Sequence, residues 1–468
     1  MTTEPPRLDP EVFRSQAHQL VDWMADYLAH LGDYPVQPDA SPGAIRAQLP
    51  TTPPAEPEPF DRIVGDFKQL IVPGLMHWGH PGFFGYFPAN TSPPSILAEM
   101  LTATIGAQCM SWNTSPAATE LEQVMMEWLR RMLGLPEQFT GVIQDTASTA
   151  TLVALITARD AGLRGKGAEG RIDRFTVYTS AEANSSVPKG ARLAGFAPGN
   201  IRLIETDDLA SLNPRALERA IAEDQAAGLI PCCVVATVGT TGSTAIDPVP
   251  ALGELCRRER IWLHIDAAFA GSAAILPELR WILDGAELAD SLVFNPHKWL
   301  LVNFDCSAYF VRDRNALLRS FAASAEILKA GFDDKVANYR DWGIQLGRRF
   351  RALKLWFVIR SYGVAGLQAL LREHIRLGKL FADWVTRDPR FELMVPAPLA
   401  TVCFRQRGAG DPDALNQGLL ARLNATGRIF LTGTRLRGHY VLRLALGHLT
   451  TTERDVAAAW QLIRDTAG

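Results

Sequence analysis

Lys298 follows a short apolar run and is flanked by an imidazole and an indole. Residues 292–294 predict a buried strand, which ends at Asn295-Pro296 because proline cannot continue a central ladder. Burial there would lower the pKa of the lysine toward that of a usable nucleophile. Lys298 is therefore a candidate for a Schiff base with an aldehyde cofactor. From this stretch alone, a lysine whose stem packs beside Trp299 while its ammonium reaches water is an equal alternative.

A carboxylate is expected at the end of a neighbouring strand. Residues 261–265 predict a strand, and Asp266 follows it directly. In an open parallel sheet, ligands bind at the carboxyl ends of the strands. A carboxylate buried there needs a partner to stay charged, either a protonated pyridine nitrogen or a nearby arginine. His264 shares a strand face with Asp266, and we interpret it as a hydrogen-bonded core histidine or a supporting group.

The segment Gln144-Asp-Thr-Ala-Ser-Thr149 joins a strand to a helix and is rich in small residues. The free amides of a helix start, together with hydroxyl groups, can bind a phosphate. The signal is weak alone, since Ser and Thr cap many helices. Asp145 is out of place beside an anion unless its side chain points away.

A lysine, a carboxylate and a phosphate cradle together are what pyridoxal 5′-phosphate (PLP) requires. The lysine binds the aldehyde, the carboxylate keeps the ring nitrogen protonated so that the ring can accept electrons, and the helix start holds the phosphate. The sequence therefore predicts PLP as the cofactor. No set of metal ligands is expected, because the six cysteines are scattered without a C-x-x-C pair.

Strand and helix patterns alternate between residues 141 and 311, which predicts an α/β fold. Continuously apolar strands separated by helices indicate a mostly parallel, seven-stranded sheet with helices on both faces. The expected strands are 141–144, 175–179, 201–205, 232–238, 261–265, 292–294 and 307–311, with helices such as 115–133, 149–161, 214–227 and 250–259 between or beside them.

The two ends of the chain show other patterns. Residues 8–32 predict an amphipathic helix, whose apolar stripe must dock on another domain or subunit. A proline-rich connector and the aromatic, glycine-rich loop 77–92 follow. We favour a pocket for a flat ligand over a satellite core for this loop, because its glycines allow close backbone approach. A long helix from 362 to about 385, strands at 401–405 and 440–445 and a helix from Thr452 indicate a small C-terminal α+β domain. The predicted division is 1–92, 93–360 and 361–468.

Bulk composition excludes several classes of function. With 468 residues, 47% hydrophobic and 21% charged, the chain is expected to fold into sizeable cores. A net charge of −3 gives no excess of positive charge of the kind that binds nucleic acid or an anionic membrane. The acidic N-terminus lacks a signal-peptide pattern, and no apolar run reaches the roughly 18 residues of a membrane span. We therefore expect a cytoplasmic protein with buried, reduced cysteines.

Five segments carry a resemblance to a known family. They are Asn295-Pro-His-Lys298-Trp, His264-Ile-Asp266-Ala-Ala, Gly141-Val-Ile-Gln-Asp-Thr-Ala-Ser148, Thr237-Val-Gly-Thr-Thr241 and Leu346-Gly-Arg-Arg-Phe-Arg351. The chain resembles the group II PLP-dependent decarboxylases, in the aromatic-L-amino-acid decarboxylase branch, over nearly its whole length. This resemblance implies fold type I of the PLP-dependent transferases. It also implies an obligate homodimer whose N-terminal helices, residues 1–92, pack across the partner, with the active site at the subunit interface.

The resemblance also assigns roles to individual residues. Lys298 would carry the cofactor, Asp266 would pair with the ring nitrogen and Ala268 would pack on one ring face. The phosphate would be surrounded by Ala147, Ser148, Asn295 and His297, with Thr241 near the ring substituents. The substrate pocket would be formed by Trp78, Tyr86, Phe87 and Met110, and Gly347 would leave space for an indole or a catechol.

Two departures from the family bear on the reaction. The family usually has His where this chain has Asn184, and that His stacks on the cofactor and helps to position the substrate carboxylate. It usually has Tyr, the proton donor to the carbon that loses CO₂, where this chain has Ile327. An amide is no useful acid or base near pH 7, and isoleucine has no proton to give. If protonation is slow, molecular oxygen can take the electrons, so we favour an aromatic acetaldehyde as product, with CO₂, NH₃ and H₂O₂.

Other outcomes stay open at this point. An ordinary decarboxylase would release the amine if another group or water supplied the proton. Transamination is disfavoured, since no arginine for a second carboxylate can be placed, and a catalytically silent PLP-binding protein is disfavoured by the complete pair of Lys298 and Asp266. Among the substrates, phenylalanine, tyrosine, DOPA and tryptophan all fit an aromatic pocket.

Overall fold

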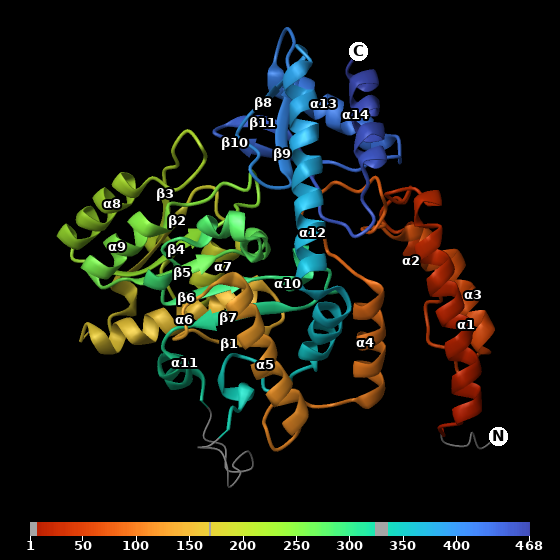
Figure 1. Cartoon of the computed structure of the whole chain (residues 1–468), viewed down its shortest axis with the longest axis horizontal. Helices are drawn as coiled ribbons and strands as arrows, with labels where there is room; N and C mark the ends of the chain where they lie inside the picture. Colours follow the sequence, from red (N-terminus) through yellow and green to blue (C-terminus); the bar gives the residue numbers. More distant parts are fainter. Residues whose placement is uncertain (1–6, 168–169, 323–335) are drawn as a thin grey trace.

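The computed structural model describes residues 7–167, 170–322 and 336–468. A seven-stranded sheet with helices on both faces forms its centre, and a four-stranded sheet lies near the C-terminus. The N-terminal helices stand along one side of the molecule (Figure 1). Within the described residues, no helix is both long and apolar enough to cross a membrane.

The large sheet has the strand order β1-β7-β6-β5-β4-β2-β3. All strand pairs are parallel except those of β7, which runs antiparallel to both β1 and β6. The prediction of a mostly parallel, seven-stranded sheet is confirmed, and no expected strand end is displaced by more than two residues. The strands are β1 (Thr140–Gln144), β2 (Phe175–Ser180), β3 (Ile201–Ile204), β4 (Ile230–Thr237), β5 (Trp262–Asp266), β6 (Ser291–Phe294) and β7 (Ser307–Val311).

The side chains of β4 alternate between the two faces of the sheet, and each face has its own layer of core residues. Val235 packs with the layer that contains α6 and α7, whereas Val234 and Ala236 face the layer of α8 and α9. Successive strand side chains point to opposite faces, so a continuously apolar strand must be covered on both. The covering helices are α5 (Pro116–Leu133), α6 (Ala147–Gly165), α7 (Ser186–Leu193), α8 (Pro214–Ala226) and α9 (Val249–Glu259).

Strand register brings the predicted chemical groups to one edge of this sheet. Asp266, the last residue of β5, lies opposite Val293 of β6 and Thr237 of β4. Lys298 follows β6 on the short helix α10 (Pro296–Trp299). Because β1 and β6 are both antiparallel to β7, they run parallel to each other, and the start of α6 after β1 lies at the same edge.

The C-terminal part begins on a helix that is longer than predicted. Helix α12 (Arg351–Arg387) has a non-helical residue, Gly363, with φ 62° and ψ 167°. The expected start of the helix at 362 thus coincides with a kink in a conformation that favours glycine. The preceding turns were missed, although Leu355 and Val358 are fully buried there.

The small sheet is antiparallel, with the order β10-β11-β9-β8. Its central strands β9 and β11 and the last helix were predicted, whereas β8, β10 and α13 were not. Strand β8 has only three residues, and β10 is polar and mostly unburied, so neither shows an apolar pattern. The elements are β8 (Phe391–Leu393), β9 (Thr401–Gln406), α13 (Pro412–Ala425), β10 (Thr432–Leu436), β11 (His439–Ala445) and α14 (Glu453–Ala467).

Helix α1 (Pro10–Ala29) confirms the expected N-terminal helix, with Asp9 as its N-cap. None of its residues is buried, and the side chains of Val12 and Phe13 are 50% and 57% exposed. The helix is held to the rest of the chain by the Tyr27 hydroxyl, which lies 2.7 Å from Nδ1 of His77. Four residues of its apolar stripe thus remain exposed in the described part of this chain: Val12, Phe13, Val21 and Leu28.

Short helical turns and longer helices connect α1 to the large sheet. Helix α4 packs against α12, and the loop after η3 pairs with the segment that precedes β10 through the bridge between Phe83 and Phe430. The connecting elements are α2 (Ala44–Gln48), α3 (Phe60–Asp66), η2 (Phe67–Ile71), η3 (Val72–Gly74) and α4 (Pro93–Ile105), whereas α11 (Arg314–Phe321) follows β7. All six cysteines are buried free thiols, as expected from their apolar surroundings.

Candidate active site

A cavity of about 190 Å³ lies at the carboxyl edge of the large sheet. It brings together residues from strands and loops that are more than two hundred positions apart in the chain. Ten of the predicted site residues line it: Phe87, Ala147, Ser148, Asn184, Thr241, Asp266, Ala268, Asn295, His297 and Lys298.

The backbone of Lys298 is fixed on both sides. Its N–H donates to the carbonyl of Asn295 over 3.0 Å, and its carbonyl accepts from Nδ2 of Asn90 over 2.7 Å. Burial, opposed by the charge of Asp266 and helped by the charge of Arg443, lowers the pKa of Lys298 to about 8. A buried lysine that lines a cavity and has a lowered pKa fits a nucleophile better than a solvated charge.

Asp266 is 4% exposed, and burial raises the pKa of its carboxyl group against the opposing charge of Lys298. Its Oδ1 accepts the N–H of Ala268 over 3.0 Å, and no arginine forms an ion pair with it among the described residues. The arginine partner that the sequence left open for Asp266 is therefore not present among the described residues. The carboxylate suits a pyridinium N–H, the donor that PLP would bring to this place.

His264, which lies two residues before Asp266 on β5, is a neutral core histidine. Its Nδ1 lies 2.9 Å from Oγ of Ser291, and burial lowers its pKa to about 3. This agrees with the interpretation of the residue as a hydrogen-bonded core group.

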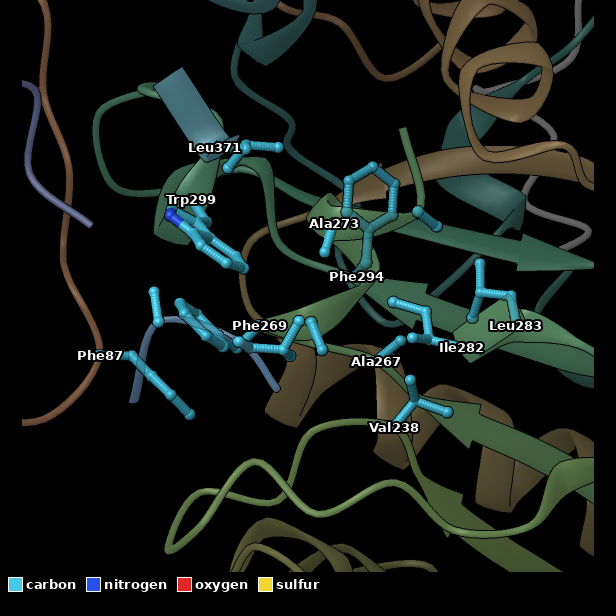
Figure 2. Close-up of a cluster of buried hydrophobic side chains, with 14 of the residues drawn as sticks. Phe87, Val238, Ala267, Phe269, Ala273, Ile282, Leu283, Phe294, Trp299 and Leu371 are labelled. Carbon is cyan, nitrogen blue, oxygen red and sulfur yellow. The ribbon is translucent and has the colours of Figure 1, made fainter. Parts of the chain in front are cut away.

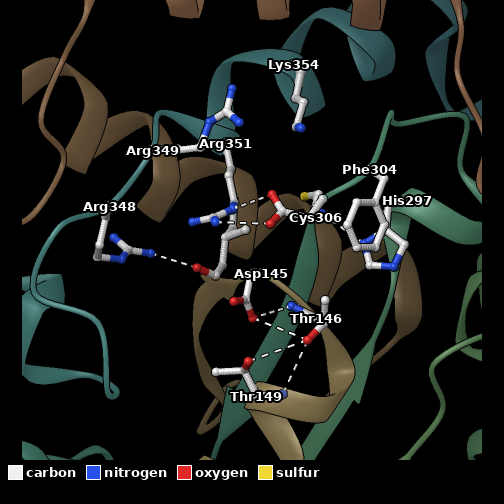
Figure 3. Close-up of polar contacts among 12 residues, drawn as sticks. Asp145, Thr146, Thr149, His297, Phe304, Cys306, Arg348, Arg349, Arg351 and Lys354 are labelled. Carbon is white, nitrogen blue, oxygen red and sulfur yellow. Dashed lines mark hydrogen bonds and ion pairs between the residues drawn. The ribbon is translucent and has the colours of Figure 1, made fainter. Parts of the chain in front are cut away.

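The first turn of α6 forms one wall of the cavity. Thr146 caps the helix, since its Oγ1 accepts the N–H of Thr149 over 3.4 Å (Figure 3). The amides at the start of any helix lack intrahelical partners and suit an anion. Asp145 does not line the cavity, because its Oδ2 accepts from Nε2 of Gln345 over 2.7 Å. The carboxylate that seemed out of place therefore points away from the anion site.

His297 offers one hydrogen-bond donor to the same wall. Its Nδ1 accepts the N–H of Cys306 over 2.9 Å, which places the ring proton on Nε2. Burial and the charges of Lys298 and Lys354 lower the pKa of His297 to about 3, so the ring is neutral. Phe304 lies beside the imidazole, with the two ring centroids 4.8 Å apart (Figure 3).

Asn295 is tied to both neighbouring strands. Its Oδ1 accepts from the hydroxyl of Ser307, and its backbone N–H donates to the carbonyl of Ala268 over 3.0 Å. The side-chain NH₂ is left to serve as a donor at the cavity wall. Together with Nε2–H of His297 and the start of α6, it gives the cavity a set of donors suited to a phosphate.

A cluster of basic residues behind this wall is neutralised by ion pairs (Figure 3). Burial lowers the pKa of Lys354 to about 8. Because each cation has an acidic partner, these groups fix the start of α12 and the segment before it against their neighbours rather than offering a free charge. The pairs are Arg348 with Glu122 at 2.7 Å, Arg351 with Asp305 at 2.8 Å and Lys354 with Glu99 at 3.0 Å.

Asn184 uses both ends of its amide within the protein. Its Nδ2 donates to Oγ1 of Thr241 over 3.1 Å, and its Oδ1 accepts the N–H of Ser186 over 2.9 Å. The side chain therefore holds Thr241 in place. It brings no titratable group to the side of the cavity where an imidazole is usual in the family.

A column of aromatic rings runs from the cavity into the core (Figure 2). Phe87 stacks on Phe269 with centroids 4.0 Å apart and planes inclined by 10°, and Phe269 stacks on Trp299 at 4.4 Å and 10°. Nζ of Lys298 lies 5.0 Å from the centroid of Phe87. The column thus fixes the wall next to the lysine, and sequence analysis did not foresee it because its members are distant in the chain.

Tyr86 and Trp78 lie outside the cavity. Tyr86, 50% exposed, lines an adjoining hollow of about 710 Å³ that shares Asn184 and Thr241 with the cavity. Trp78 stacks on Tyr86 with centroids 5.4 Å apart. The two rings form a border of the approach to the cavity.

Met110 and Gly347 are not brought to the cavity of this chain. The carbonyl of Met110 accepts the N–H of Arg340 over 2.8 Å, and a Cβ at Gly347 would lie 3.3 Å from Nε2 of Gln108. The two segments contact each other, since the N–H of Cys109 donates to the carbonyl of Arg348. Ile327 lies outside the described residues.

Arg443 is a residue of this region that sequence analysis missed. It lies on β11, is 3% exposed, and its guanidinium carbon is 4.5 Å from the centroid of Phe87. A single charge inside the apolar run 441–446 was the signal that could have found it.

The fold and the cavity together define a PLP-dependent enzyme of fold type I. Residues 42–407 match the family model described as the pyridoxal-dependent decarboxylase conserved domain. The chain belongs to this family of decarboxylases, and its cofactor is PLP.

Known relatives include enzymes with two different kinds of product. The chain is 46% identical to the aromatic-L-amino-acid decarboxylase of Rattus norvegicus, with 98% of each chain covered. It is 43% identical to the phenylacetaldehyde synthase of Arabidopsis thaliana, covering 98% of this chain and 95% of the relative. A crystal structure of Oryza sativa TDC with PLP and tryptamine superposes with a TM-score of 0.97 at 41% identity, covering 99% of both chains.

Proposed function

We propose that the protein decarboxylates an aromatic L-amino acid and then deaminates it oxidatively. One molecule each of amino acid, O₂ and water would give an aromatic acetaldehyde, CO₂, NH₃ and H₂O₂. The electron pair left at Cα after loss of CO₂ passes to O₂, which is reduced to peroxide, and hydrolysis of the C–N bond then releases the aldehyde.

PLP supplies the electron sink for the loss of CO₂ when it is bound. Around it, Lys298 provides the amine that holds the aldehyde, and Asp266 keeps a proton on the ring nitrogen. Nε2–H of His297, the NH₂ of Asn295 and the start of α6 hold the phosphate. These roles are supported by the position of each group in one cavity.

The observation that carries the aldehyde product is Asn184. Its amide is committed to Thr241 and Ser186 and has no proton to transfer near pH 7. An imidazole that could exchange a proton on this side is thereby absent from the described wall of the cavity. A relative of the aldehyde-forming kind, phenylacetaldehyde synthase, agrees with this choice.

The alternative product is the amine, and one observation favours it. Lys298 has a pKa lowered to about 8 by burial, so its amine can carry a proton back toward Cα near neutral pH. The relation to aromatic-L-amino-acid decarboxylase supports this outcome equally. The two products differ in oxygen use, which makes them separable by experiment.

We propose further that two copies of the chain form each active site. Met110 and Gly347 lie away from the cavity of their own chain, and much of the apolar stripe of α1 is exposed in the described chain. A homodimer would cover this stripe and bring Met110 and Gly347 to the partner's cavity. The absence of a side chain at Gly347 would then leave space for a large ring such as indole, which is consistent with the tryptamine in the similar crystal structure.

The function is tested by incubating the PLP-loaded protein with each aromatic amino acid while CO₂, O₂ uptake and H₂O₂ are followed together. We expect equal amounts of CO₂, O₂ consumed and peroxide. CO₂ release without oxygen uptake would identify an amine-forming decarboxylase. Lys298→Ala is the control, and CO₂ release that survives in it would show that the cavity is not the site.

A further inference from the structure

A second cavity, of about 420 Å³, lies where the large sheet's helical layer meets the segment between β8 and β9. It shares no lining residue with the cofactor cavity. Its walls come mainly from the loop before α9, the turns of η7 (Pro277–Leu283) and residues 395–398. The volume falls within the roughly 300–1,000 Å³ that is usual for small-molecule sites. We call it the interdomain cavity.

The walls of the interdomain cavity are apolar and rigid. Ile282 is 1% exposed and packs in the core cluster shown in Figure 2, so this wall is fixed by the core. The ring of Trp281 is 49% exposed, which lets a flat ligand reach it without unfolding. Proline has a fixed φ and no N–H, and four prolines line the cavity: Pro248, Pro250, Pro396 and Pro398. Such walls suit an aromatic ring.

The charged residues that line the interdomain cavity are both acidic, Asp247 and Asp284. Asp247 is already committed, because its two oxygens accept the N–H groups of Leu212 and Thr237 over 2.7 Å each. Asp284 is exposed, and its carboxylate forms no hydrogen bond or ion pair with a described residue. Its backbone N–H donates to the carbonyl of Trp281 over 3.0 Å, so a free carboxylate and an open indole lie close together.

This charge pattern selects the kind of ligand. Because no Lys, Arg or His lines the cavity within the described chain, an anion would meet only repulsion there. A cation with an apolar body would meet the carboxylate of Asp284 at one end and the ring of Trp281 along its length. A protonated aromatic amine has both properties.

One loop connects the interdomain cavity to the cofactor cavity. Gly239 and Thr241 line the cofactor cavity, whereas residues 243–247 line the interdomain cavity. The two limbs of the loop are tied together, since the N–H groups of Gly239 and Thr240 both donate to the carbonyl of Ala245, over 2.9 and 3.0 Å. A ligand packed on the second limb would therefore hold the first limb more firmly.

We propose that the interdomain cavity binds a protonated aromatic amine. The aromatic ring lies against Trp281 and the prolines, and the ammonium pairs with Asp284. Binding there needs neither PLP nor Lys298, and it stabilises the loop that carries Thr241. The site is thus independent of the proposed reaction and of which product that reaction forms.

The test uses N,N-dimethylphenethylamine as the probe, because a tertiary amine is protonated near pH 7 but cannot form a Schiff base with the cofactor. Its binding to the PLP-loaded protein is measured by isothermal titration calorimetry, and 3-phenylpropionate serves as the ligand of opposite charge. We expect a Kd below about 1 mM for the amine. Binding of the carboxylate should be weaker by about tenfold or more.

Two variants remove the two parts of the site separately. Trp281→Ala removes the aromatic wall and should weaken amine binding by about tenfold or more. Asp284→Asn keeps the shape and removes the charge, so it should weaken binding by roughly three- to fivefold, the size of an exposed ion pair. Asp208→Asn is the matched control, because Asp208 is 99% exposed and adjoins Leu209 of the wall without lining the cavity. It should leave the affinity unchanged.

Hydrogen exchange locates the bound amine. With saturating probe, the amides of Gly239 and Thr240 should exchange more slowly by about twofold or more, because opening of the loop is opposed. The effect should be smaller in Trp281→Ala at the same probe concentration. Binding without slower exchange would overturn the stabilisation of the loop.

Three other results would overturn the amine site itself. They are no binding with a Kd below about 10 mM, equal affinity for 3-phenylpropionate, and an affinity for the amine that neither Trp281→Ala nor Asp284→Asn changes. If Trp281→Ala fails to fold, Asp284→Asn decides, since it leaves the packing intact.

Discussion

Nε1–H of Trp299 donates to Nδ1 of His374 over 3.0 Å, and Nε2 of His374 lies 2.9 Å from the carbonyl of His448. An indole nitrogen can only donate, so Nδ1 must accept and the ring proton is on Nε2. The tautomer of a histidine in α12 is thus fixed by the residue directly after Lys298. Through this pair, the aromatic column beside the lysine is joined to the C-terminal part of the chain.

Replacing His374 tests the importance of this link for stability. His374→Phe keeps a ring but leaves the buried N–H of Trp299 and the carbonyl of His448 without partners. At about 1–3 kcal/mol for each unsatisfied group, the free energy of unfolding should fall by roughly 2–4 kcal/mol in urea denaturation. His374→Asn, which keeps an acceptor near Trp299, should lose less. A loss below about 0.5 kcal/mol for the Phe variant would contradict the expectation.

The same histidine gives a prediction about pH. Burial lowers the pKa of His374 to about 4, below the 6.5 of an unperturbed imidazole. Between pH 6.5 and 4 the unfolded chain binds more protons at this position, so the stabilisation is complete above pH 6.5 and is lost as the pH falls. At pH 5 about 2 kcal/mol of it should be gone. The stability difference between wild type and His374→Asn should therefore be smaller at pH 5 than at pH 7.

Loading of the apoprotein with PLP should report on the pKa of Lys298. Only the neutral amine attacks an aldehyde, so the loading rate should rise with pH and level off above about 8. Asp266→Asn should move this midpoint to lower pH, because the carboxylate raises the lysine pKa. Arg443→Gln should move it to higher pH, because the guanidinium lowers that pKa. Rates are followed by cofactor absorbance after rapid mixing, and a midpoint near 10 would contradict the burial of the amine.

The choice between aldehyde and amine is expected to depend on Asn184. Asn184→His, alone and together with Ile327→Tyr, adds groups that can transfer a proton, so the ratio of H₂O₂ to CO₂ should fall and the amine should accumulate. Product analysis by mass spectrometry measures the ratio. Asn184→Gln is the control that keeps an amide. An unchanged ratio in both His-containing variants would show that neither position controls the branch.

Mixing two inactive variants tests whether the site is shared between copies. Lys298→Ala removes the amine, and Gly347→Trp would block the site to which Gly347 contributes. If Gly347 belongs to the partner's cavity, a dimer of one chain of each kind has one complete site, and co-expression should restore activity. If all parts of the site come from one chain, the mixture stays inactive. Separately tagged chains, purified in two steps, allow the mixed dimers to be assayed alone.

Local patterns were sufficient to predict most of the fold and the central chemical groups. The seven strands are apolar runs that end in recognisable breakers, and Asp266 and Lys298 directly follow two of them. Such positions depend only on a strand and the residue after it. The helix before Gly363 was missed because its pattern continues through a residue that ordinarily ends helices.

What could not be predicted depends on contacts between distant segments. Phe87 and Phe269 stack although 182 positions separate their numbers in the chain. Arg443 becomes part of the site only because the small sheet folds back against the loop at Tyr86. The commitment of Asn184 to Thr241 likewise needs the loop after β4 to lie beside α7. No local spacing encodes these contacts.

The single antiparallel strand of the large sheet acts as a spacer. With β7 inserted between β1 and β6, the start of α6 and the turn that carries Lys298 are separated by two strand spacings, about 10 Å, instead of one. This separation would suit a cofactor whose phosphate is held at the start of α6 while its aldehyde is bound by Lys298 after β6. The reversed strand contributes only the hydroxyl of Ser307 to this edge, yet its width fixes the length of the ligand that the site accepts.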